Sequence, residues 1–360
     1  MTDAEGMARA LFHAARGRGR TSPNPMVGAV VVTPDGVVVG QGYHAQAGGP
    51  HAEVYALEMA GARARGATLY CTLEPCSHTG RTAPCVPRIV EAGIARVVAA
   101  TEDPNPVVSG RGFAYLRAQG IVVDVGPGAA EAEALNAPFF TVMREGRPFV
   151  TMKAALSRDG CIAAAPGQCT AISGSDAQRH AHQLRAEVDA IAVGSGTVLV
   201  DNPRLTARGA WRARPLTRVV LDRRLRTPLD ARLWETLDAG PVLIVTTASA
   251  VAEQPERRED LEARGAQLVL ADGTIRGALQ ALVPRGITDV LLEGGAAVHA
   301  AAWREQVVDH LRLYVANHAF GPQGVRWMPD DAVWRAFEPA PRVEPLGCDT
   351  LIDGHVHRSH

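Results

Sequence analysis

One histidine, one glutamate and two cysteines in the first half of the sequence are of the types that build a catalytic zinc site. His51 precedes Glu53 by two positions, and Cys76 and Cys85 each follow a proline. A catalytic zinc ion takes three protein ligands and keeps one position for water. His51, Cys76 and Cys85 supply one imidazole and two thiolates. We expect Glu53 to reach the water rather than the ion, and to shuttle its proton during a hydrolysis.

The same residues also fit other kinds of site. A structural zinc site has four protein ligands, and Cys71 is the nearest further cysteine. Cys71 lies within an apolar segment, which favours a place in the core for this thiol. A non-catalytic zinc scaffold and an unligated trio of cysteines are the alternatives to the catalytic site.

Composition excludes several classes of protein. The chain has 360 residues, a net charge of −1 and 46% apolar residues, which suits two globular domains with no strong attraction for nucleic acid or a membrane surface. No run of about 18 apolar residues is present, so no membrane-spanning helix is expected. Residues 1–20 contain no apolar signal core, so we expect a cytoplasmic protein. In the cytoplasm, clustered cysteines are more often metal ligands than partners in disulfides.

The elements that must position these residues alternate between helix and strand. Spacing and composition predict helices at 3–16, 51–63, 84–91 and 110–119. Apolar runs predict strands at 27–32, 36–42, 67–73, 95–101 and 121–125. His51 opens one predicted helix and the cysteines flank the start of another, where the helix dipole favours thiolates. This order is typical of a mostly parallel sheet covered by helices.

A polar stretch with glycine and proline at 144–148 predicts a boundary between a first domain, 1–146, and a second, 147–360. The second half alternates again. Strands are expected at 149–156, 190–193, 219–222, 242–246, 267–270 and 289–292. A helix is expected at 177–187, and the end of the chain, from Leu311, is expected to be β-rich.

The first half resembles the zinc nucleobase deaminases, whose signature is His-x-Glu followed by Pro-Cys and a second Cys. Eight residues separate the two cysteines here, where most of these deaminases have two. The inserted segment, PCSHTGRTAPC at 75–85, is similar to one branch, the bifunctional riboflavin-biosynthesis deaminase–reductases. So are TSPNPMVG at 21–28 and GGPHAE at 48–53, and the similarity spans nearly the whole first half.

The resemblance implies a cytidine-deaminase-like three-layer α-β-α domain. It implies hydrolysis of the 2-amino group of a 2,5-diamino-6-(5-phosphoribosylamino)pyrimidinone, with Zn2+ on His51, Cys76 and Cys85 and with Glu53 as the proton shuttle. It places six further residues around the substrate: Asn24, His44, His78, Arg81, Asp103 and Asn105. Each of these alone is typical of a turn or a surface, so their assignment depends on the joint pattern.

The second half carries TMKAALS at 151–157, GSGTVLVDNPRLTAR at 194–208 and LEGG at 292–295. These segments are similar to the second domain of the same family. The resemblance implies a dihydrofolate-reductase-like α/β fold for this half. It also implies that this domain reduces the ribosyl side chain of the substrate to ribityl with NADPH. It implies a substrate site formed by Lys153, Cys169, Arg185, Asp201, Leu205, Arg208 and Glu293. Arg185 and Arg208 are expected to hold the ribose phosphate in bidentate fashion.

The same resemblance implies a cofactor site. Its residues are Ala155, Ala171, Ser173, Gly194, Gly196, Thr197, Asp201, Asp222, Gly294 and Gly295. Glycines between a strand and a helix let backbone amides approach a phosphate, although Leu199 occupies the last position of a full Gly-x-Gly-x-x-Gly. Arg223 and Arg224, after a predicted strand, are candidates for contact with a 2′-phosphate.

Some residues depart from the family pattern. Cys169 and Ala171 stand where these enzymes usually have Ser-x-Trp. A deaminase with a second domain that binds a ligand without reducing it is therefore an alternative. A nucleic-acid-editing deaminase is disfavoured by the neutral charge and the absence of a basic aromatic stripe. The expected ligand is a small phosphorylated pyrimidine, and no nucleic-acid or membrane partner is expected. The chain is expected to form a homo-oligomer, either a dimer or a tetramer.

Overall fold

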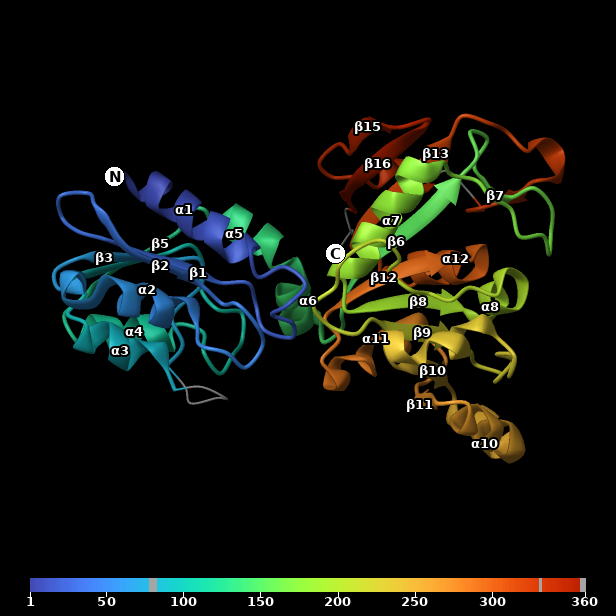
Figure 1. The fold of residues 1–360 in the computed structure, drawn as a ribbon, viewed down its shortest axis with the longest axis horizontal. Helices are drawn as coiled ribbons and strands as arrows, with labels where there is room; N and C mark the ends of the chain where they lie inside the picture. Colours follow the sequence, from blue (N-terminus) through green and yellow to red (C-terminus); the bar gives the residue numbers. More distant parts are fainter. Residues whose placement is uncertain (78–82, 330–331, 357–360) are drawn as a thin grey trace. The chain divides into compact units, whose positions relative to one another are not determined.

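The structure is a computed structural model that describes residues 1–77, 83–329 and 332–356. The chain divides into two units, Met1–Gly146 and Arg147–His360, which are described separately (Figure 1). Within the described residues, no helix is both long enough and apolar enough to cross a bilayer.

The N-terminal unit is built on a five-stranded sheet in the order β2-β1-β3-β4-β5. Its strands are β1 (Gly28–Val32), β2 (Val38–Tyr43), β3 (Thr68–Cys71), β4 (Arg96–Ala99) and β5 (Val122–Val125). The strands β3, β4 and β5 are parallel, whereas β1 is antiparallel to both β2 and β3. Four of the five strands nevertheless run in the same direction, in agreement with the expected mostly parallel sheet, and β1 is the exception. The short turn between β1 and β2 forces one antiparallel pair, and β1 also meets β3 in the reverse direction.

Helices cover both faces of this sheet, which gives three layers (Figure 1). The helices are α1 (Asp3–Ala15), α2 (Ala52–Ala60), α3 (Cys85–Glu91), α4 (Arg111–Ala118), α5 (Ala129–Leu135) and α6 (Ala137–Glu145). The apolar residues of α1 and α5 pack on one face, and those of α2, α3 and α4 pack on the other. A Cβ on Gly40 would lie 2.0 Å from the Ala56 carbonyl oxygen, so this glycine lets α2 lie directly on β2.

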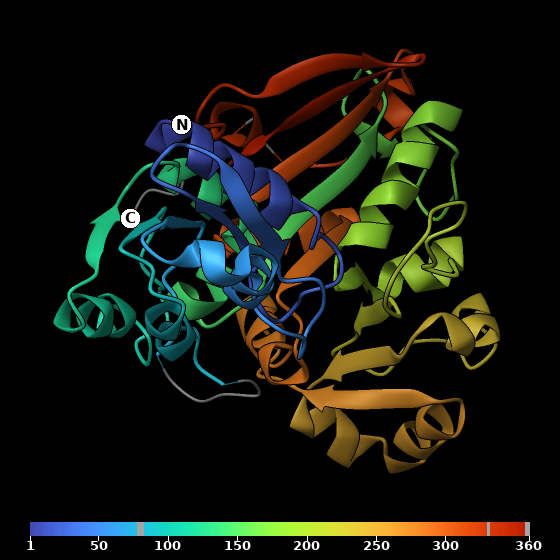
Figure 2. The ribbon, with the colours of Figure 1, turned by 60° about the vertical axis from the view of Figure 1, so that its left-hand side comes forward.

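The C-terminal unit is built on a nine-stranded sheet in the order β11-β10-β9-β8-β12-β6-β13-β16-β15. Its strands are β6 (Phe149–Leu156), β8 (Ala190–Gly194), β9 (Thr217–Leu221), β10 (Val242–Thr246), β11 (Ala266–Leu270), β12 (Asp289–Gly294), β13 (His310–Ala316), β15 (Arg342–Leu346) and β16 (Asp349–His355). All neighbours are parallel except the pairs β13–β16 and β16–β15. Figure 2 shows the orange β11 and the red β15–β16 at opposite edges.

Helices also cover both faces of this second sheet. They are α7 (Ser175–Glu187), α8 (Ser195–Asp201), α9 (Ala248–Glu253), α10 (Pro255–Ala263), α11 (Ile275–Gln280) and α12 (Ala296–Arg304). One core contains apolar residues of α7 and α8, and a larger one on the other face contains those of α11 and α12. The short strands β7 (Cys161–Ala163) and β14 (Val325–Arg326) pair separately. The β-rich end expected from the sequence is confirmed.

Candidate active sites

The histidine and two cysteines of the N-terminal unit meet at the starts of two helices. His51 is the N-cap of α2, and Cys85 is the first residue of α3. The His51 Nδ1 atom lies 3.4 Å from the Cys76 Sγ atom and 3.3 Å from the Cys85 Sγ atom. All three candidate ligand atoms lie within 4.8 Å of one another. One imidazole nitrogen and two sulfurs facing a common point form a donor set that suits zinc.

The electrostatic environment of this cluster favours a thiolate. A hydrogen bond with the Cys85 thiol, together with the nearby His51, lowers the pKa of Cys76 despite its burial, while the same hydrogen bond and burial raise the pKa of Cys85. The backbone N–H of Cys85 also donates to the Cys76 Sγ atom, over 3.3 Å. Thiolate is the form of cysteine that binds metal, so the residues fit the ion that their types suggested.

Glu53 lies on the first turn of α2 and is only 3% exposed. Among the described residues, its buried Oε2 atom has no hydrogen-bond partner. Burial raises the pKa of Glu53, and the negative charge of Cys76 adds to this effect, against the opposing influence of His51. A buried carboxylate with a free oxygen beside three metal-type ligands is suited to accept and release a proton.

A cavity of about 330 Å³ opens beside this cluster and includes Asn24, His44, Glu53, Asp103 and Asn105 in its lining. The His44 Nδ1 atom lies 3.1 Å from the Pro50 carbonyl oxygen, and its Nε2 atom lies 3.2 Å from the Asn24 Nδ2 atom. A carbonyl can only accept and an amide nitrogen can only donate, so His44 is neutral, with its proton on Nδ1. Burial lowers the pKa of His44, which agrees with this form.

Glu74 is a residue of the same cavity that the sequence did not reveal. Its buried carboxylate accepts four backbone N–H bonds, of 2.8–3.3 Å, from Asp103, Gly110, Gly112 and Phe113. It thereby ties the loop that carries Asp103 and Asn105 to the segment that leads into Cys76. The Asp103 Oδ1 atom in turn accepts the Asn105 N–H at 2.8 Å.

Two predicted substrate residues, His78 and Arg81, lie outside the described residues. Cys71, the candidate fourth ligand, is buried in the core of the sheet and does not join the cluster of three. Its Sγ atom lies 3.8 Å from the Val98 carbonyl oxygen. Among the described residues, the cluster therefore has three ligands, and a three-ligand zinc site leaves a position for water, unlike a closed four-ligand site.

In the C-terminal unit, three of the predicted residues form a buried charge cluster. Arg185 donates from Nε and Nη2 to the two Glu293 carboxylate oxygens, at 2.7 and 2.6 Å. The Lys153 Nζ atom lies 4.0 Å from Glu293 Oε2 and 5.6 Å from the Tyr314 ring centroid. Burial alone would raise the pKa of Glu293, but the charges of Arg185 and Lys153 lower it to about 2. Glu293 is therefore ionised and organises two cations.

A cleft of about 390 Å³ is rich in arginine. Its lining includes Arg185, Asp201, Leu205, Arg208 and Arg232. Arg185 has already committed three of its five N–H donors, two to Glu293 and one to the Thr206 carbonyl oxygen. The Nε–Nη2 side of the Arg185 guanidinium therefore faces Glu293, and the bidentate contact with a phosphate stays a prediction for its two remaining N–H donors.

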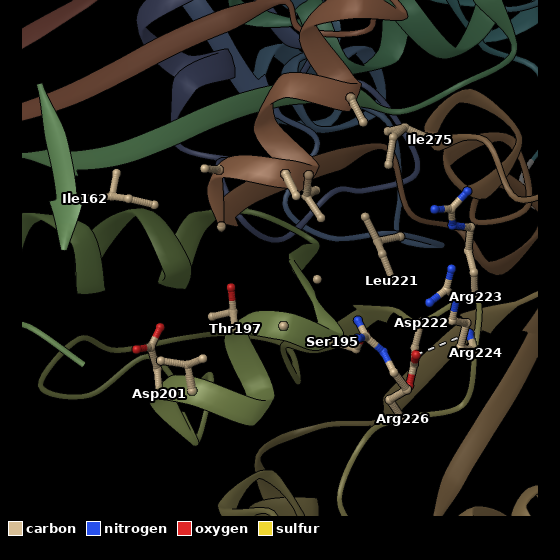
Figure 3. A pocket seen from close by; sticks show the side chains of 18 of the residues that line it. Ile162, Ser195, Thr197, Asp201, Leu221, Asp222, Arg223, Arg224, Arg226 and Ile275 are labelled. Carbon is tan, nitrogen blue, oxygen red and sulfur yellow. Dashed lines mark hydrogen bonds between the residues drawn. The ribbon is translucent and has the colours of Figure 1, made fainter. Parts of the chain in front are cut away.

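A larger cavity, of about 1010 Å³, runs along the ends of β8, β9 and β12 (Figure 3). Of the predicted residues, those that line it are Cys169, Gly194, Gly196, Thr197, Asp201, Asp222, Arg223, Arg224 and Gly295. In the described part of the chain, Ala155, Ala171, Ser173 and Gly294 are not in its lining, and Lys153 and Glu293 line neither this cavity nor the arginine-rich cleft. Gly294 instead faces the imidazole of His299, whose Cε1 atom would lie 3.7 Å from an added Cβ.

Asp201 lines both the large cavity and the arginine-rich cleft. The two spaces therefore adjoin at this residue. Further residues that the sequence reasoning missed are Arg226 on the large cavity and Arg204 and Arg232 on the cleft. Arg226 could have been predicted to line the large cavity, because it lies two positions after Arg224 in the sequence RRLR at 223–226. Nothing near Arg232 in the sequence connects it with Arg208.

Two family models match the chain. One describes the cytidine and deoxycytidylate deaminase zinc-binding region and matches residues 1–101, and the other is the RibD C-terminal domain, over residues 148–356. The chain belongs to the RibD family. It is 40% identical to the riboflavin biosynthesis protein RibD of Aquifex aeolicus over 353 residues, which cover 96% of each chain. It is also 40% identical to RibD of Escherichia coli, covering 98% of this chain and all of that one.

Solved RibD structures agree with this fold. Acinetobacter baumannii RibD aligns with a TM-score of 0.88 at 35% identity, over 99% of each chain. A deaminase/reductase of Thermotoga maritima, named as a diaminohydroxyphosphoribosylaminopyrimidine deaminase and 5-amino-6-(5-phosphoribosylamino)uracil reductase, aligns with a TM-score of 0.83 at 34% identity. The expected two-part α/β fold is confirmed. The prediction of a RibD-type enzyme is also confirmed: it acts on a small molecule and combines deaminase and reductase activities in riboflavin biosynthesis.

The cofactors Zn2+ and NADPH are supported by the zinc-binding region and the RibD reductase domain. The alternatives of a zinc scaffold and of a second domain without reductase activity are not favoured.

Proposed function

We propose that residues 1–146 deaminate a diamino-phosphoribosylaminopyrimidine and that residues 147–360 reduce the ribosyl side chain of the product with NADPH. The observation that carries the proposal is the buried Glu53 carboxylate, whose free Oε2 atom adjoins a cavity beside His51, Cys76 and Cys85. The two substrates named for the Thermotoga maritima relative support this choice of pyrimidine.

In the deaminase step, His51, Cys76 and Cys85 would hold Zn2+, which would supply the Lewis acidity that makes water nucleophilic near neutral pH. Glu53 takes a proton from the attacking water on Oε2 and returns it to the departing amine. The carbon–oxygen bond forms, the carbon–nitrogen bond breaks, and ammonia leaves. The raised pKa of Glu53 suits it to hold the proton between these two events.

The other residues of this cavity recognise the ring. Asn24 has committed an N–H to His44, which leaves its carbonyl oxygen available to accept from the pyrimidine. Its neighbours Pro23 and Pro25 restrict the backbone, so the amide loses little freedom when substrate binds. Asp103 and Asn105 reach the cavity from the loop that Glu74 fastens, and we assign His78 and Arg81 to substrate on the family pattern.

In the reductase step, NADPH supplies the hydride, and the chain orients the two reactants. We assign the large cavity to NADPH and the arginine-rich cleft to the phosphoribosyl group. Arg208, helped by Arg232, is the main phosphate partner, because Arg185 is committed to Glu293. The junction of the two spaces at Asp201 supports a meeting of nicotinamide and sugar at this residue.

One assay tests both halves. The full chain, loaded with zinc, is incubated with the diamino substrate in the presence and absence of NADPH, and the product masses are recorded. We expect exchange of an amine for oxygen without NADPH, and a further gain of two hydrogens with it. An unchanged substrate mass would refute the deaminase assignment, and a deaminated product that NADPH leaves unchanged would refute the reductase assignment.

We further propose a homo-oligomer, dimer or tetramer, in the cytoplasm. All six cysteines are free thiols, and thiolate ligands persist best in a reducing compartment. Closed symmetric assemblies are common among enzymes. Light scattering on the purified chain tests the assembly, and a molar mass equal to one chain across the micromolar range would refute it.

A further inference from the structure

Arg208 lines the arginine-rich cleft with a guanidinium group that is not committed to another residue. Arg185 pairs with Glu293, and Arg204 donates from Nη2 to Glu235 Oε2 at 2.9 Å. Arg208 is exposed, and within the described residues neither an ion pair nor a hydrogen bond engages its side chain. Such a cation can bind a phosphate, provided that the backbone carries it to the right place.

The neighbouring charges in the cleft push this side chain away. Burial lowers the pKa of Arg208, and the positive charges of Arg185, Arg204 and Arg232 lower it further, against the attraction of Glu293. Cations that lower the pKa of one another also repel one another. On a loose segment, Arg208 would therefore move toward solvent before a ligand binds, so its position must be set through its backbone.

The segment that carries Arg208 is fixed at three points. The side chain of Leu205 is 2% exposed and packs with apolar residues of α7, although its backbone is left-handed, with φ 54°. The Thr206 carbonyl oxygen accepts from Arg185 Nη1 at 3.0 Å. The Arg208 N–H donates to His182 Nδ1 at 3.1 Å. Two residues one turn apart on α7 therefore hold this backbone.

The contact with His182 fixes residue 208 itself. In the described part of the chain, it is the hydrogen bond that the Arg208 backbone makes. Gly209 follows with a left-handed φ of 69°, and the chain turns away from α7 at that point. Without the imidazole, the nearest upstream hold would be the Thr206 carbonyl oxygen, two residues before the arginine.

The imidazole of His182 can hold this backbone only when it is neutral. A backbone N–H can only donate, so Nδ1 accepts and the ring proton is on Nε2. Burial lowers the pKa of His182, and the charges of Arg185 and Arg208 lower it further, against the charge of Glu293. Among the described residues, His182 is not in the lining of the arginine-rich cleft, so it would act on a ligand through Arg208.

We propose that His182 is a positioning residue for the reductase: its Nδ1 atom holds the Arg208 backbone so that the guanidinium group faces the phosphate of the substrate. The proposal rests on the proposed function, which assigns the arginine-rich cleft to the phosphoribosyl group. A contact that already exists in the free protein reduces the entropy lost on binding. His182 therefore strengthens the binding of substrate and leaves the hydride-transfer step unchanged.

The test measures reductase kinetics of the full-length chain with 5-amino-6-(5-phosphoribosylamino)uracil at saturating NADPH. His182→Leu removes the acceptor, whereas His182→Asn has nearly the same shape as the leucine variant and keeps an oxygen that can replace Nδ1. We expect KM to rise by on the order of tenfold in His182→Leu, because about one residue of the segment must then be ordered on binding. In His182→Asn the rise should stay below about threefold, and kcat should change by less than about twofold in both variants.

A double-mutant cycle with Arg208 separates positioning from a general structural role. Arg208→Gln removes the cation and should raise KM by on the order of a hundredfold. If His182 acts through Arg208, His182→Leu causes no further rise in the Arg208→Gln background. The proposal would be overturned by a further rise in that background, by equal rises in His182→Leu and His182→Asn, or by an unchanged KM in His182→Leu.

Gln183→Leu is the matched control, because Gln183 is the next residue of α7, is exposed and lies outside the linings of the cleft and the large cavity. It should leave KM and kcat unchanged. Nitrogen-15 NMR of the histidine rings is a second measurement, which does not depend on the folding of the leucine variant. In the wild-type chain, the signals that His182→Asn removes should show a proton on Nε2, and a proton on Nδ1 would contradict the proposal.

The same measurements distinguish failure of this role from failure of the proposed function. A raised KM in Arg208→Gln with no change in His182→Leu would refute only the role of His182. An unchanged KM in Arg208→Gln would refute the assignment of the cleft to the phosphate, and with it this proposal. A wild-type chain that does not reduce the substrate with NADPH would refute the reductase assignment itself.

Discussion

The two units arrange their reactive groups in different ways. In the N-terminal unit, three ligand atoms lie within 4.8 Å of one another, and a nearly fully buried carboxylate lies beside them on a cavity of about 330 Å³. In the C-terminal unit, the cavity is about three times larger, and exposed arginines lie at one end of it. In its charge cluster, the Glu293 carboxylate faces both Arg185 and Lys153.

The difference reflects the chemistry of each half. Hydrolysis needs a residue that moves a proton, and Glu53 has both the burial and the free oxygen for it. In hydride transfer the reactive group belongs to the cofactor, so the protein needs only to bind the cofactor and the substrate in the correct relative orientation. A single substitution should therefore abolish the deaminase activity, whereas single substitutions in the C-terminal unit should reduce the reductase activity only partly.

Glu53→Gln should lower deaminase turnover by about 10²–10⁴-fold, because the amide cannot take the proton from water. Zinc content, measured by mass spectrometry of the metal, should stay at one ion per chain, since the three ligands remain. Glu58→Gln is the control on the same helix, because Glu58 is exposed and forms only a surface ion pair with Arg88. Full turnover in Glu53→Gln would show that deamination does not depend on this single proton-transfer residue, and would contradict the difference between the two units.

Glu293→Gln should act mainly on stability and ligand affinity. It leaves the buried Arg185 without a charged partner, which typically destabilises a fold by about 3 kcal/mol. All five tryptophans lie beyond residue 147, so tryptophan fluorescence during urea unfolding reports on the C-terminal unit alone. Glu262→Gln, on the exposed side of α10, is the control. A fluorescence midpoint that does not move would show that the pair contributes little.

Glu74→Gln should have a smaller effect, confined to the deaminase pocket. The glutamine amide group would face two of the four N–H donors, at a cost of about 2 kcal/mol. The loop that carries Asp103 should loosen, so KM should rise more than kcat falls while zinc is retained. Amide hydrogen exchange at Gly110 and Gly112 should speed up. Unchanged exchange at these amides, or the same change in Glu91→Gln, would contradict this role.

Glu74 also illustrates what a sequence can and cannot reveal. The zinc cluster was predictable because its ligands follow a family spacing and lie at helix starts, where local rules apply. Glu74 directly precedes Pro75 and Cys76, but the amides that it binds lie 29 to 39 residues later, in a loop and at the start of α4, and only the folded sheet brings them together. The pairing of β1 with β3 and the pairing of Arg185 with Glu293 were not predicted for the same reason, because each joins residues that are far apart in the sequence.

The smallest effect concerns a buried histidine of the C-terminal unit. His299 is 2% exposed; its Nδ1 atom accepts from Trp327 Nε1 at 2.7 Å, and its Nε2 atom lies 3.2 Å from the Leu292 carbonyl oxygen. Both contacts require the neutral ring, with its proton on Nε2. Burial lowers the pKa of His299 from the ordinary 6.5 to about 4, against the hydrogen bond to Leu292.

The sign of the pH dependence follows from this shift. Between pH 6.5 and about 4 the unfolded chain binds a proton at His299 that the folded chain does not, so stability falls as the pH falls through this window. At about pH 5.5 the loss is about 1 kcal/mol. Tryptophan-monitored unfolding at pH 7.5 and 5.5 should therefore show a smaller pH dependence in His299→Gln than in the wild type. The exposed His318→Gln should keep the wild-type dependence, and an equal reduction in both variants would show that the buried imidazole is not the source.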